Sequence, residues 1–235
     1  AQMAAAERLE ALAVALGSWH PAARSKLLSV FSRKRGSQPR GIYLHGAVGR
    51  GKTMLMDQFY EAVRLQPRRR IHFHEFMAEV HDRIGAARKR VKGDPIPQVG
   101  AEIAASADLL CFDELHVTDI ADAMILSRLF AGFFAEDTVV VATSNAHPSA
   151  LYRNGLNRQL FLPFIALLEE HLDVLELKAA KDFRLEKLAG QRLYFSPADA
   201  AAGAELDRLW LRLTGSAAAR PADLELKGRK VHVPA

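Results

Sequence analysis

The residues whose types and spacing are best suited to chemistry form the run Gly46-Ala47-Val48-Gly49-Arg50-Gly51-Lys52-Thr53. This run fits the pattern G-x-x-x-x-G-K-[ST], in which glycines allow backbone N–H groups to turn toward phosphates and the following helix adds a favourable dipole. Lys52 would reach the terminal phosphates, and the Thr53 hydroxyl would bind magnesium. A glycine-rich surface turn is the alternative. The flanking segments favour a phosphate loop, because a strand-like run (42–45) precedes it and a helical one (54–63) follows. We predict that these eight residues and Met54 bind the nucleotide.

Two acidic residues, Asp113 and Glu114, follow the apolar run 109–112. After a phosphate loop, the first acid would organise magnesium and the second would polarise the attacking water as a general base. A pair of carboxylates that merely caps a strand is the alternative. The combination predicts nucleoside-triphosphate hydrolysis, with magnesium held by Thr53 and Asp113, largely through water, and with Lys52 on the phosphates.

Two further polar residues are candidates for catalysis. Asn145 ends the run Thr143-Ser144-Asn145, where it could hold the attacking water or the terminal phosphate against Glu114; a plain transition from strand to turn is the alternative. Arg158 could stabilise charge on the transferred phosphate from a neighbouring subunit. For this arginine a surface salt bridge is the alternative, and Arg153 is a rival on spacing alone.

The elements that must position these residues alternate along the chain. Apolar, strand-length runs indicate strands buried on both faces, and helical spacing indicates the segments between them. This order predicts a parallel α/β sheet with right-handed crossovers. A hairpin is expected at 183–196, and an amphipathic helix at 198–213. The expected strands are 42–45, 71–73, 109–112, 138–142 and 172–177, and further helices are expected at 7–16, 22–31, 54–63 and 119–135.

Composition narrows the class of protein. The 235 residues are 49% hydrophobic and 25% charged, which is ordinary for a soluble globular protein. The single cysteine, Cys111, excludes an intramolecular disulfide and favours a reducing compartment, so we expect a cytoplasmic location. The opening 17 residues lack the uninterrupted apolar run of a signal peptide, and no run approaches the ~20 residues of a membrane helix.

The excess positive charge and three histidines have no settled role. A net charge of +5 could attract nucleic acid, acidic proteins or anionic lipid, but a solvated face is the simplest interpretation, and no aromatic residues interleave with the basic ones as nucleic-acid stacking would require. His72 and His74 are expected on one face of a strand, with His81 further on. Zinc usually takes four ligands, so we favour a structural or substrate-facing role for them, in a segment that could face the pore of a ring. The basic clusters are Arg33-Lys34-Arg35, Arg68-Arg69-Arg70 and Arg88-Lys89-Arg90.

Several blocks together resemble the ZapE-type ATPases, cell-division-associated members of the AAA+ class whose mitochondrial relatives are the "ATPase family gene one-like" proteins. The similarity covers about residues 1–197. Leu115-His116 stands where relatives often carry phenylalanine and glutamine. The blocks are 43–53, His72-Phe73-His74-Glu75-Phe76-Met77, 80–83, Phe112-Asp113-Glu114, 117–126, Thr143-Ser144-Asn145, 151–152, Gly155-Leu156-Asn157-Arg158 and 161–165.

The resemblance implies a P-loop fold of the AAA+ type with a five-stranded parallel sheet in the order 5-1-4-3-2. It implies an N-terminal helical segment (1–35), a nucleotide-binding core (36–180), and a hairpin with a partial C-terminal lid (181–235). Arg184 matches a family motif but receives no role.

For function, the resemblance implies ATP and Mg²⁺ as cofactors, assembly of subunits with Arg158 acting in trans, and a protein partner in the bacterial division ring, FtsZ. The expected activity is magnesium-dependent ATP hydrolysis that remodels a protein assembly. A nucleic-acid-associated helicase loader and an adaptor for membrane-protein turnover are the alternatives; nucleic acid is not the favoured partner.

Overall fold

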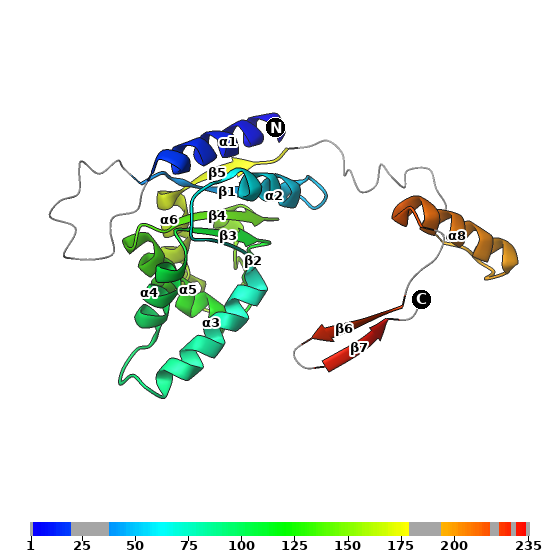
Figure 1. The fold of residues 1–235 in the computed structure, drawn as a ribbon. Coiled ribbons are helices and arrows are strands. Elements are labelled where there is room, and N and C mark those ends of the chain that lie inside the picture. Colours follow the sequence, from blue (N-terminus) through cyan, green and yellow to red (C-terminus); the bar gives the residue numbers. More distant parts are fainter. Residues whose placement is uncertain (1, 20–37, 179–193, 217–220, 227–228, 234–235) are drawn as a thin grey trace. The chain divides into compact units, whose positions relative to one another are not determined.

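Five parallel strands form the sheet that carries the candidate residues (Figure 1). The computed structural model describes residues 2–19, 38–178, 194–216, 221–226 and 229–233. The strand order is β2-β3-β4-β1-β5, which confirms the predicted order 5-1-4-3-2. All four neighbouring pairs are parallel. The strands are β1 (Gly41–His45), β2 (Arg68–His72), β3 (Leu109–Asp113), β4 (Val139–Ser144) and β5 (Leu172–Glu176).

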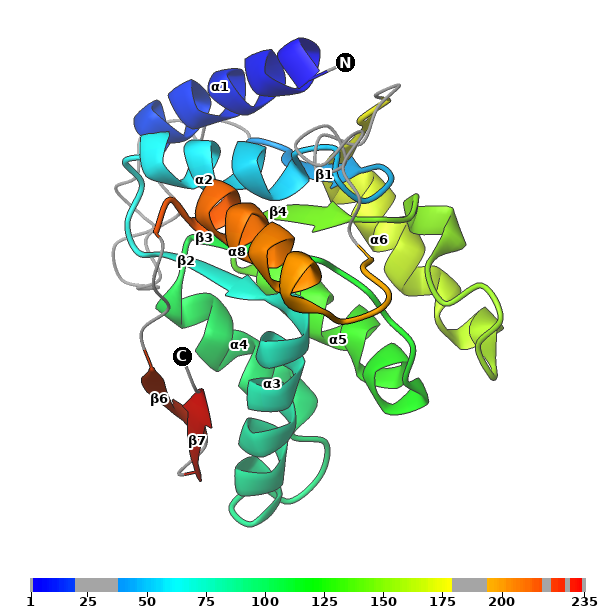
Figure 2. The ribbon, with the colours of Figure 1, turned by 90° about the vertical axis from the view of Figure 1, so that its right-hand side faces the viewer.

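Helices cover both faces of the sheet, which explains why the central strands are almost continuously apolar. Ile42 and Leu44 of β1 pack with the buried residues of α1 and α2, whereas Tyr43 between them packs with α3, α4, α5 and α6. Figure 2 shows α1 and α2 above the strands and α4 and α5 below them. The helices are α1 (Gln2–Ser18), α2 (Lys52–Ala62), α3 (Phe73–Arg88), α4 (Ile96–Ser106), α5 (Ile120–Ala135) and α6 (Leu162–His171).

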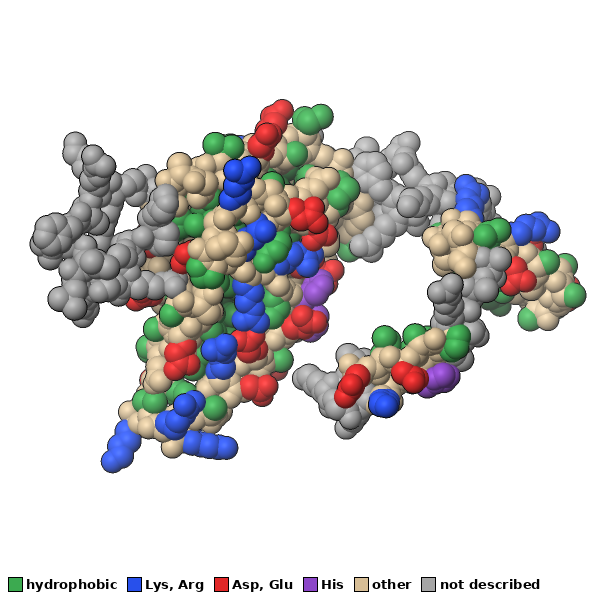
Figure 3. Space-filling model, in the orientation of Figure 1, with side chains coloured by type: hydrophobic (Ala, Val, Ile, Leu, Met, Phe, Trp, Pro, Cys, Tyr) green, Lys and Arg blue, Asp and Glu red, His purple; other side chains and the backbone are tan. Residues whose placement is uncertain are grey.

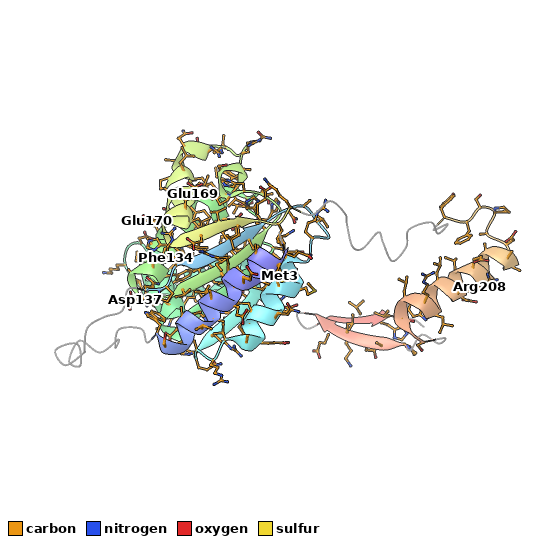
Figure 4. The ribbon with its side chains drawn as sticks, turned by 90° about the horizontal axis from the view of Figure 1, so that it is seen from above. Met3, Phe134, Asp137, Glu169, Glu170 and Arg208 are labelled. Carbon is orange, nitrogen blue, oxygen red and sulfur yellow. The ribbon has the colours of Figure 1, made fainter. Side chains whose placement is uncertain are left out.

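Helix α1 is fixed on the sheet by an apolar stripe and by one ion pair. Leu9, Leu12 and Leu16 recur at helical spacing and are buried, and Arg8 pairs with Asp173 of β5. Seen from above, α1 and α2 run side by side, and Met3 marks the beginning of α1 (Figure 4). The beginning of α1 is therefore held beside the loop from which α2 starts.

The predicted strand 71–73 is wrong in its bounds, and the solvated interpretation of the run Arg68-Arg69-Arg70 is wrong with it. These arginines form most of β2, and α3 begins already at Phe73. Because β2 is an edge strand with half-exposed side chains, ion pairs and aliphatic stems replace the apolar pattern that marks a buried strand. His74 consequently lies on a helix, not on a strand face shared with His72.

The contacts between residues divide the chain into two units, Ala1–Lys187 and Leu188–Ala235. The second unit holds α8 (Ala200–Thr214), whose first turn is capped by Asp199, and an antiparallel hairpin of β6 (Ala222–Leu226) and β7 (Arg229–Val233). The helix 22–31, Arg33-Lys34-Arg35, Arg184 and nearly all of the hairpin 183–196 lie outside the described residues. The predicted domain boundaries at 35 and 180 fall there too and stay predictions.

Candidate nucleotide-binding site

The phosphate loop joins the end of β1 to the beginning of α2, at the carboxyl edge of the sheet. Gly49 and Gly51 have φ of 77° and 82°, in the left-handed region that favours glycine. A Cβ on Gly51 would also lie 3.1 Å from Nε2 of Gln2. The backbone conformation therefore favours glycine here, and a side chain at position 51 would also press on Gln2.

A cavity of about 590 Å³ opens over this loop. Its walls come from three parts of the chain that are distant in sequence: the beginning of α1, the phosphate loop with the first turn of α2, and the ends of β3 and β4. Val48 and Met54 are each 51% exposed and supply apolar surface on the loop side. The lining residues are Gln2, Val48, Gly49, Arg50, Gly51, Lys52, Thr53, Met54, Glu114, Thr143 and Asn145.

Lys52 and Asn145, predicted from separate motifs, meet in this cavity. The Lys52 Nζ atom donates to the Asn145 Oδ1 atom over 2.9 Å. It also donates to the carbonyl oxygens of Gly46 and Ala47, at 2.7 and 2.9 Å. Those two residues line no part of the cavity, and they hold the lysine through their carbonyl groups. The ammonium group is thus already positioned over the loop that would hold phosphate.

Asp113 has no exposed surface and is held by three side chains. Its Oδ1 atom accepts hydrogen bonds from the hydroxyls of Thr143, at 2.5 Å, and Thr53, at 3.3 Å. Its Oδ2 atom accepts from the guanidinium of Arg70, at 3.0 Å. A hydroxyl and a carboxylate so close together are the oxygen ligands that Mg²⁺ prefers, so Thr53 and Asp113 fit a magnesium site.

Glu114 has a backbone conformation that is unusual for its residue type. Its φ is 56°, in the left-handed region, which costs roughly 1–2 kcal/mol for a residue other than glycine. The Thr143 hydroxyl accepts a hydrogen bond from the Glu114 N–H over 2.9 Å, and the Leu115 N–H donates to the Thr143 carbonyl oxygen over 2.7 Å. Such strain persists where its surroundings enforce it, often at functional sites. Here it leaves Glu114 on the cavity wall.

Three contributors to the site were missed by the sequence analysis. Thr143 belongs to the run Thr143-Ser144-Asn145, in which we assigned a role to Asn145 alone. The Thr143 hydroxyl donates to Asp113 and accepts a hydrogen bond from the Glu114 N–H. The Gln2 Nε2 atom donates to the Arg50 carbonyl oxygen over 2.9 Å, and nothing in the local spacing of α1 indicates this contact. Arg70 was part of a basic cluster, and its type alone could have suggested a carboxylate partner.

Arg158 does not line the cavity of its own chain. It begins a short 3₁₀ helix (Arg158–Leu160), and its NH2 atom donates to the Ser149 carbonyl oxygen over 2.7 Å. Its Nε atom is buried and has no hydrogen-bond partner among the residues that the structure describes. Leu156 and Leu160 beside it are 69% and 56% exposed. The arginine therefore lies outside the cavity, in a loop that also carries two exposed leucines.

The three histidines lie on two elements, His72 at the end of β2 and His74 and His81 on α3. The rings of His72 and His74 lie 5.8 Å apart, and His81 is 2.6 Å from Asp122. In the parts of the chain that the structure describes, no group of three His, Cys, Asp or Glu residues could hold a metal ion.

Burial lowers the pKa of His45, just ahead of the phosphate loop, and the nearby His147 lowers this pKa further.

Of the basic clusters, only Arg88-Lys89-Arg90 is exposed among the described residues. It lies at the end of α3, where Lys and Arg side chains gather in Figure 3. Among the same described residues, no helix has the length and apolar character needed to span a membrane.

Comparison with known proteins gives consistent results. The family model for AFG1-like ATPase matches residues 1–235. The chain is 43% identical over 190 residues to cell division protein ZapE of Escherichia coli K12, covering 81% of this chain and 50% of that protein. It is 44% identical over 207 residues to lactation elevated protein 1 homolog B of Danio rerio, covering 82% of this chain and 41% of that protein. The chain thus spans about half the length of the curated relatives it matches.

Among solved structures, the chain is similar to the replication initiator DnaA bound to AMPPCP and single-stranded DNA, with a TM-score of 0.52 and 15% identity over 89% of this chain and 60% of that one. It is also similar to DnaI, with a TM-score of 0.51 and 13% identity over 73% of this chain and 81% of that one. At such identities the likeness concerns the fold alone, and it confirms the predicted AAA+ type of P-loop fold.

Proposed function

The chain belongs to the AFG1-like ATPase family, and from that premise we propose that it hydrolyses ATP with magnesium in the cavity on the phosphate loop. One observation carries the proposal: a single cavity joins the phosphate loop to Glu114, Thr143 and Asn145, next to a hydroxyl–carboxylate pair suited to magnesium. A loop that only bound phosphate would need none of the groups from β3 and β4.

In the proposed mechanism the residues have separate tasks. Lys52 and the loop N–H groups bind the terminal phosphates, and Thr53 and Asp113 would hold magnesium, largely through water. When bound, magnesium would neutralise charge that develops on the phosphate oxygens. Glu114 accepts a proton from the attacking water. Asn145, which already contacts Lys52, orients this water or the terminal phosphate.

We also propose that hydrolysis requires a second copy of the chain, because Arg158 lines no part of the cavity in its own subunit. The arginine would reach the nucleotide of a neighbour, and the exposed leucines around it would pack on that neighbour's surface. Removal of Arg158 should lower turnover without weakening nucleotide binding. Mixing Arg158→Ala subunits with Lys52→Ala subunits should restore part of the turnover.

The primary test is ATP turnover by the purified chain with magnesium or with EDTA. Lys52→Ala should abolish nucleotide binding and turnover. Glu114→Gln should abolish turnover and leave binding intact. Glu102 is an exposed acid on α4 that accepts a hydrogen bond from Gln98, so Glu102→Gln is the matched control and should behave as wild type. Turnover that survives both site substitutions would refute the proposal.

For the biological role, we propose that hydrolysis remodels or regulates a protein assembly of bacterial cell division, with FtsZ as the partner and in the cytoplasm. The support is the 43% identity to a protein named for cell division. The basic charge is poor support for nucleic acid, because Arg69 and Arg70 pair with acids of the same chain. The Arg68 guanidinium donates to the carbonyl oxygens of Tyr60 and Val63.

A trapped complex would test the partner. Glu114→Gln protein with ATP and magnesium should retain FtsZ in a pull-down, and Lys52→Ala protein should not. DNA binding with a steep salt dependence, lost when Arg88-Lys89-Arg90 is neutralised, would favour the helicase-loader alternative instead. Absence of FtsZ from the trapped complex would refute the division role and leave the ATPase proposal standing.

A further inference from the structure

We propose that Arg70 is a positioning residue that balances the charge of Asp113 in the nucleotide-free protein and thereby sets how tightly the site binds magnesium. The inference rests on the magnesium site proposed above.

The first step concerns the burial of Asp113. A carboxylate with no exposed surface is costly to keep ionised unless a positive group or several donors stabilise it. The two threonine hydroxyls on Oδ1 are neutral. Arg70 is therefore the charged group among the partners of this carboxylate, and its NH2 atom lies 3.0 Å from Oδ2.

The second step concerns how the two carboxylate oxygens are used. Thr53, the predicted magnesium ligand, contacts Oδ1, whereas Arg70 contacts Oδ2. The guanidinium thus contacts the oxygen that faces away from Thr53, and Oδ1 is presented on the Thr53 side, where it accepts the two threonine hydroxyls. Its positive charge nevertheless lies next to the place where a divalent cation would bind, and like charges repel.

The third step is that Arg70 holds a second acid at the same time. Its NH2 atom also lies 2.7 Å from Oδ1 of Asp57, which is on α2, the helix that begins with Lys52 and Thr53. One nitrogen is therefore shared by two acids, and the buried Nε atom has no hydrogen-bond partner within the described part of the chain. Because Asp57 already contacts this nitrogen, the guanidinium can shift toward Asp57 when magnesium takes over the charge of Asp113.

The neighbouring arginine shows the contrast. Arg69 contacts both carboxylate oxygens of Glu79, which in turn accepts a hydrogen bond from Arg83. That pair lowers the pKa of Glu79 and does not involve Asp113. Arg69 and Arg70 are similarly accessible, with side chains 30% and 24% exposed. Arg69→Met is therefore a matched control for Arg70→Met.

The experiment measures thermal unfolding of the nucleotide-free chain in EDTA and calorimetric binding of AMPPCP at stepped magnesium concentrations. Arg70→Met should unfold at a lower temperature than wild type in EDTA, and magnesium with AMPPCP should restore most of that loss. The magnesium concentration for half-maximal AMPPCP binding should fall by about three-fold or more relative to Arg69→Met, on the scale of charge–charge interactions near a surface. A role that only braces the fold would leave this concentration unchanged.

Asp57→Asn gives an independent test, because Asp57 is 49% exposed and its loss should not prevent folding. The Arg70 guanidinium would then pair with Asp113 alone and stay next to the metal position, so the half-maximal magnesium concentration should rise. In the Arg70→Met background the same change should have a smaller effect. If the half-maximal magnesium concentration is the same for Arg70→Met and Arg69→Met while wild type depends on magnesium, the role of Arg70 is refuted and the proposed magnesium site stands. If AMPPCP binding by wild type does not depend on magnesium, the proposed magnesium site is refuted as well.

Discussion

Thr143→Val tests whether one hydroxyl organises both acids of the site. The Thr143 Oγ1 atom donates to Asp113 and accepts the N–H of Glu114, and the side chain is buried. Valine has nearly the same shape, so the substitution removes two hydrogen bonds without opening a cavity. We expect a loss of stability together with a loss of turnover, because Asp113 and Glu114 would both become less well held.

The structure sets the magnitude. A hydrogen bond to a charged group contributes about 1.5–3 kcal/mol, and a buried N–H without a partner costs about 1–3 kcal/mol. Asp113 keeps Thr53 and Arg70, so part of the first loss is recovered. We therefore expect the free energy of unfolding to fall by about 2–4 kcal/mol in all. For a unit of this size a loss of ~3 kcal/mol lowers the melting temperature by roughly 6–12 °C.

The assay is urea and thermal unfolding followed by circular dichroism, with ATP turnover measured in parallel. Thr138→Val is the matched control, because Thr138 is equally buried and its hydroxyl makes a long hydrogen bond, 3.3 Å to the Ala107 carbonyl oxygen. It should cost about 0.5–1.5 kcal/mol and leave turnover unchanged. If Thr143→Val costs no more than Thr138→Val, the hydroxyl does not organise the acids.

Three further substitutions give separate predictions. Gln2→Ala removes the hydrogen bond to the Arg50 carbonyl oxygen and should weaken AMPPCP binding roughly two- to ten-fold in calorimetry, since such a bond contributes about 0.5–1.5 kcal/mol; unchanged affinity would show that α1 plays no part. Burial lowers the pKa of His45, so below roughly pH 6.5 the unfolded chain takes up a proton at this residue more readily than the folded chain does. The free energy of unfolding should therefore fall between pH 7 and pH 5. His45→Phe should make this fall smaller in urea unfolding, and an unchanged pH dependence would contradict the prediction. Gly41→Ala would place a Cβ 1.9 Å from the Val140 carbonyl oxygen, so the free energy of unfolding should fall by ~3 kcal/mol or more, or the variant should fail to fold. A stable variant in urea unfolding would show that β1 and β4 can move apart.

Much of the fold was predictable because its signals are local. The runs at β1, β3 and β4 are buried on both faces, so their near-continuous apolar character identified them directly. Their order came from the family resemblance, and the structure confirmed it. Strand β2 was misread because an edge strand made of arginines lacks an apolar signal, and its acidic partners lie on other elements.

The sequence by itself determined the phosphate loop, the two acids at the end of β3 and the polar end of β4, because each is a short pattern on one segment. The tertiary structure alone decided how these segments meet. It placed Thr53 3.3 Å from Asp113, brought Gln2 to the loop across 48 positions of chain, and set Arg70 between Asp57 and Asp113. Such contacts depend on strand register and helix packing, which are properties of the whole fold. A single run of residues can specify a chemical group, and the neighbours of that group come from elsewhere in the chain.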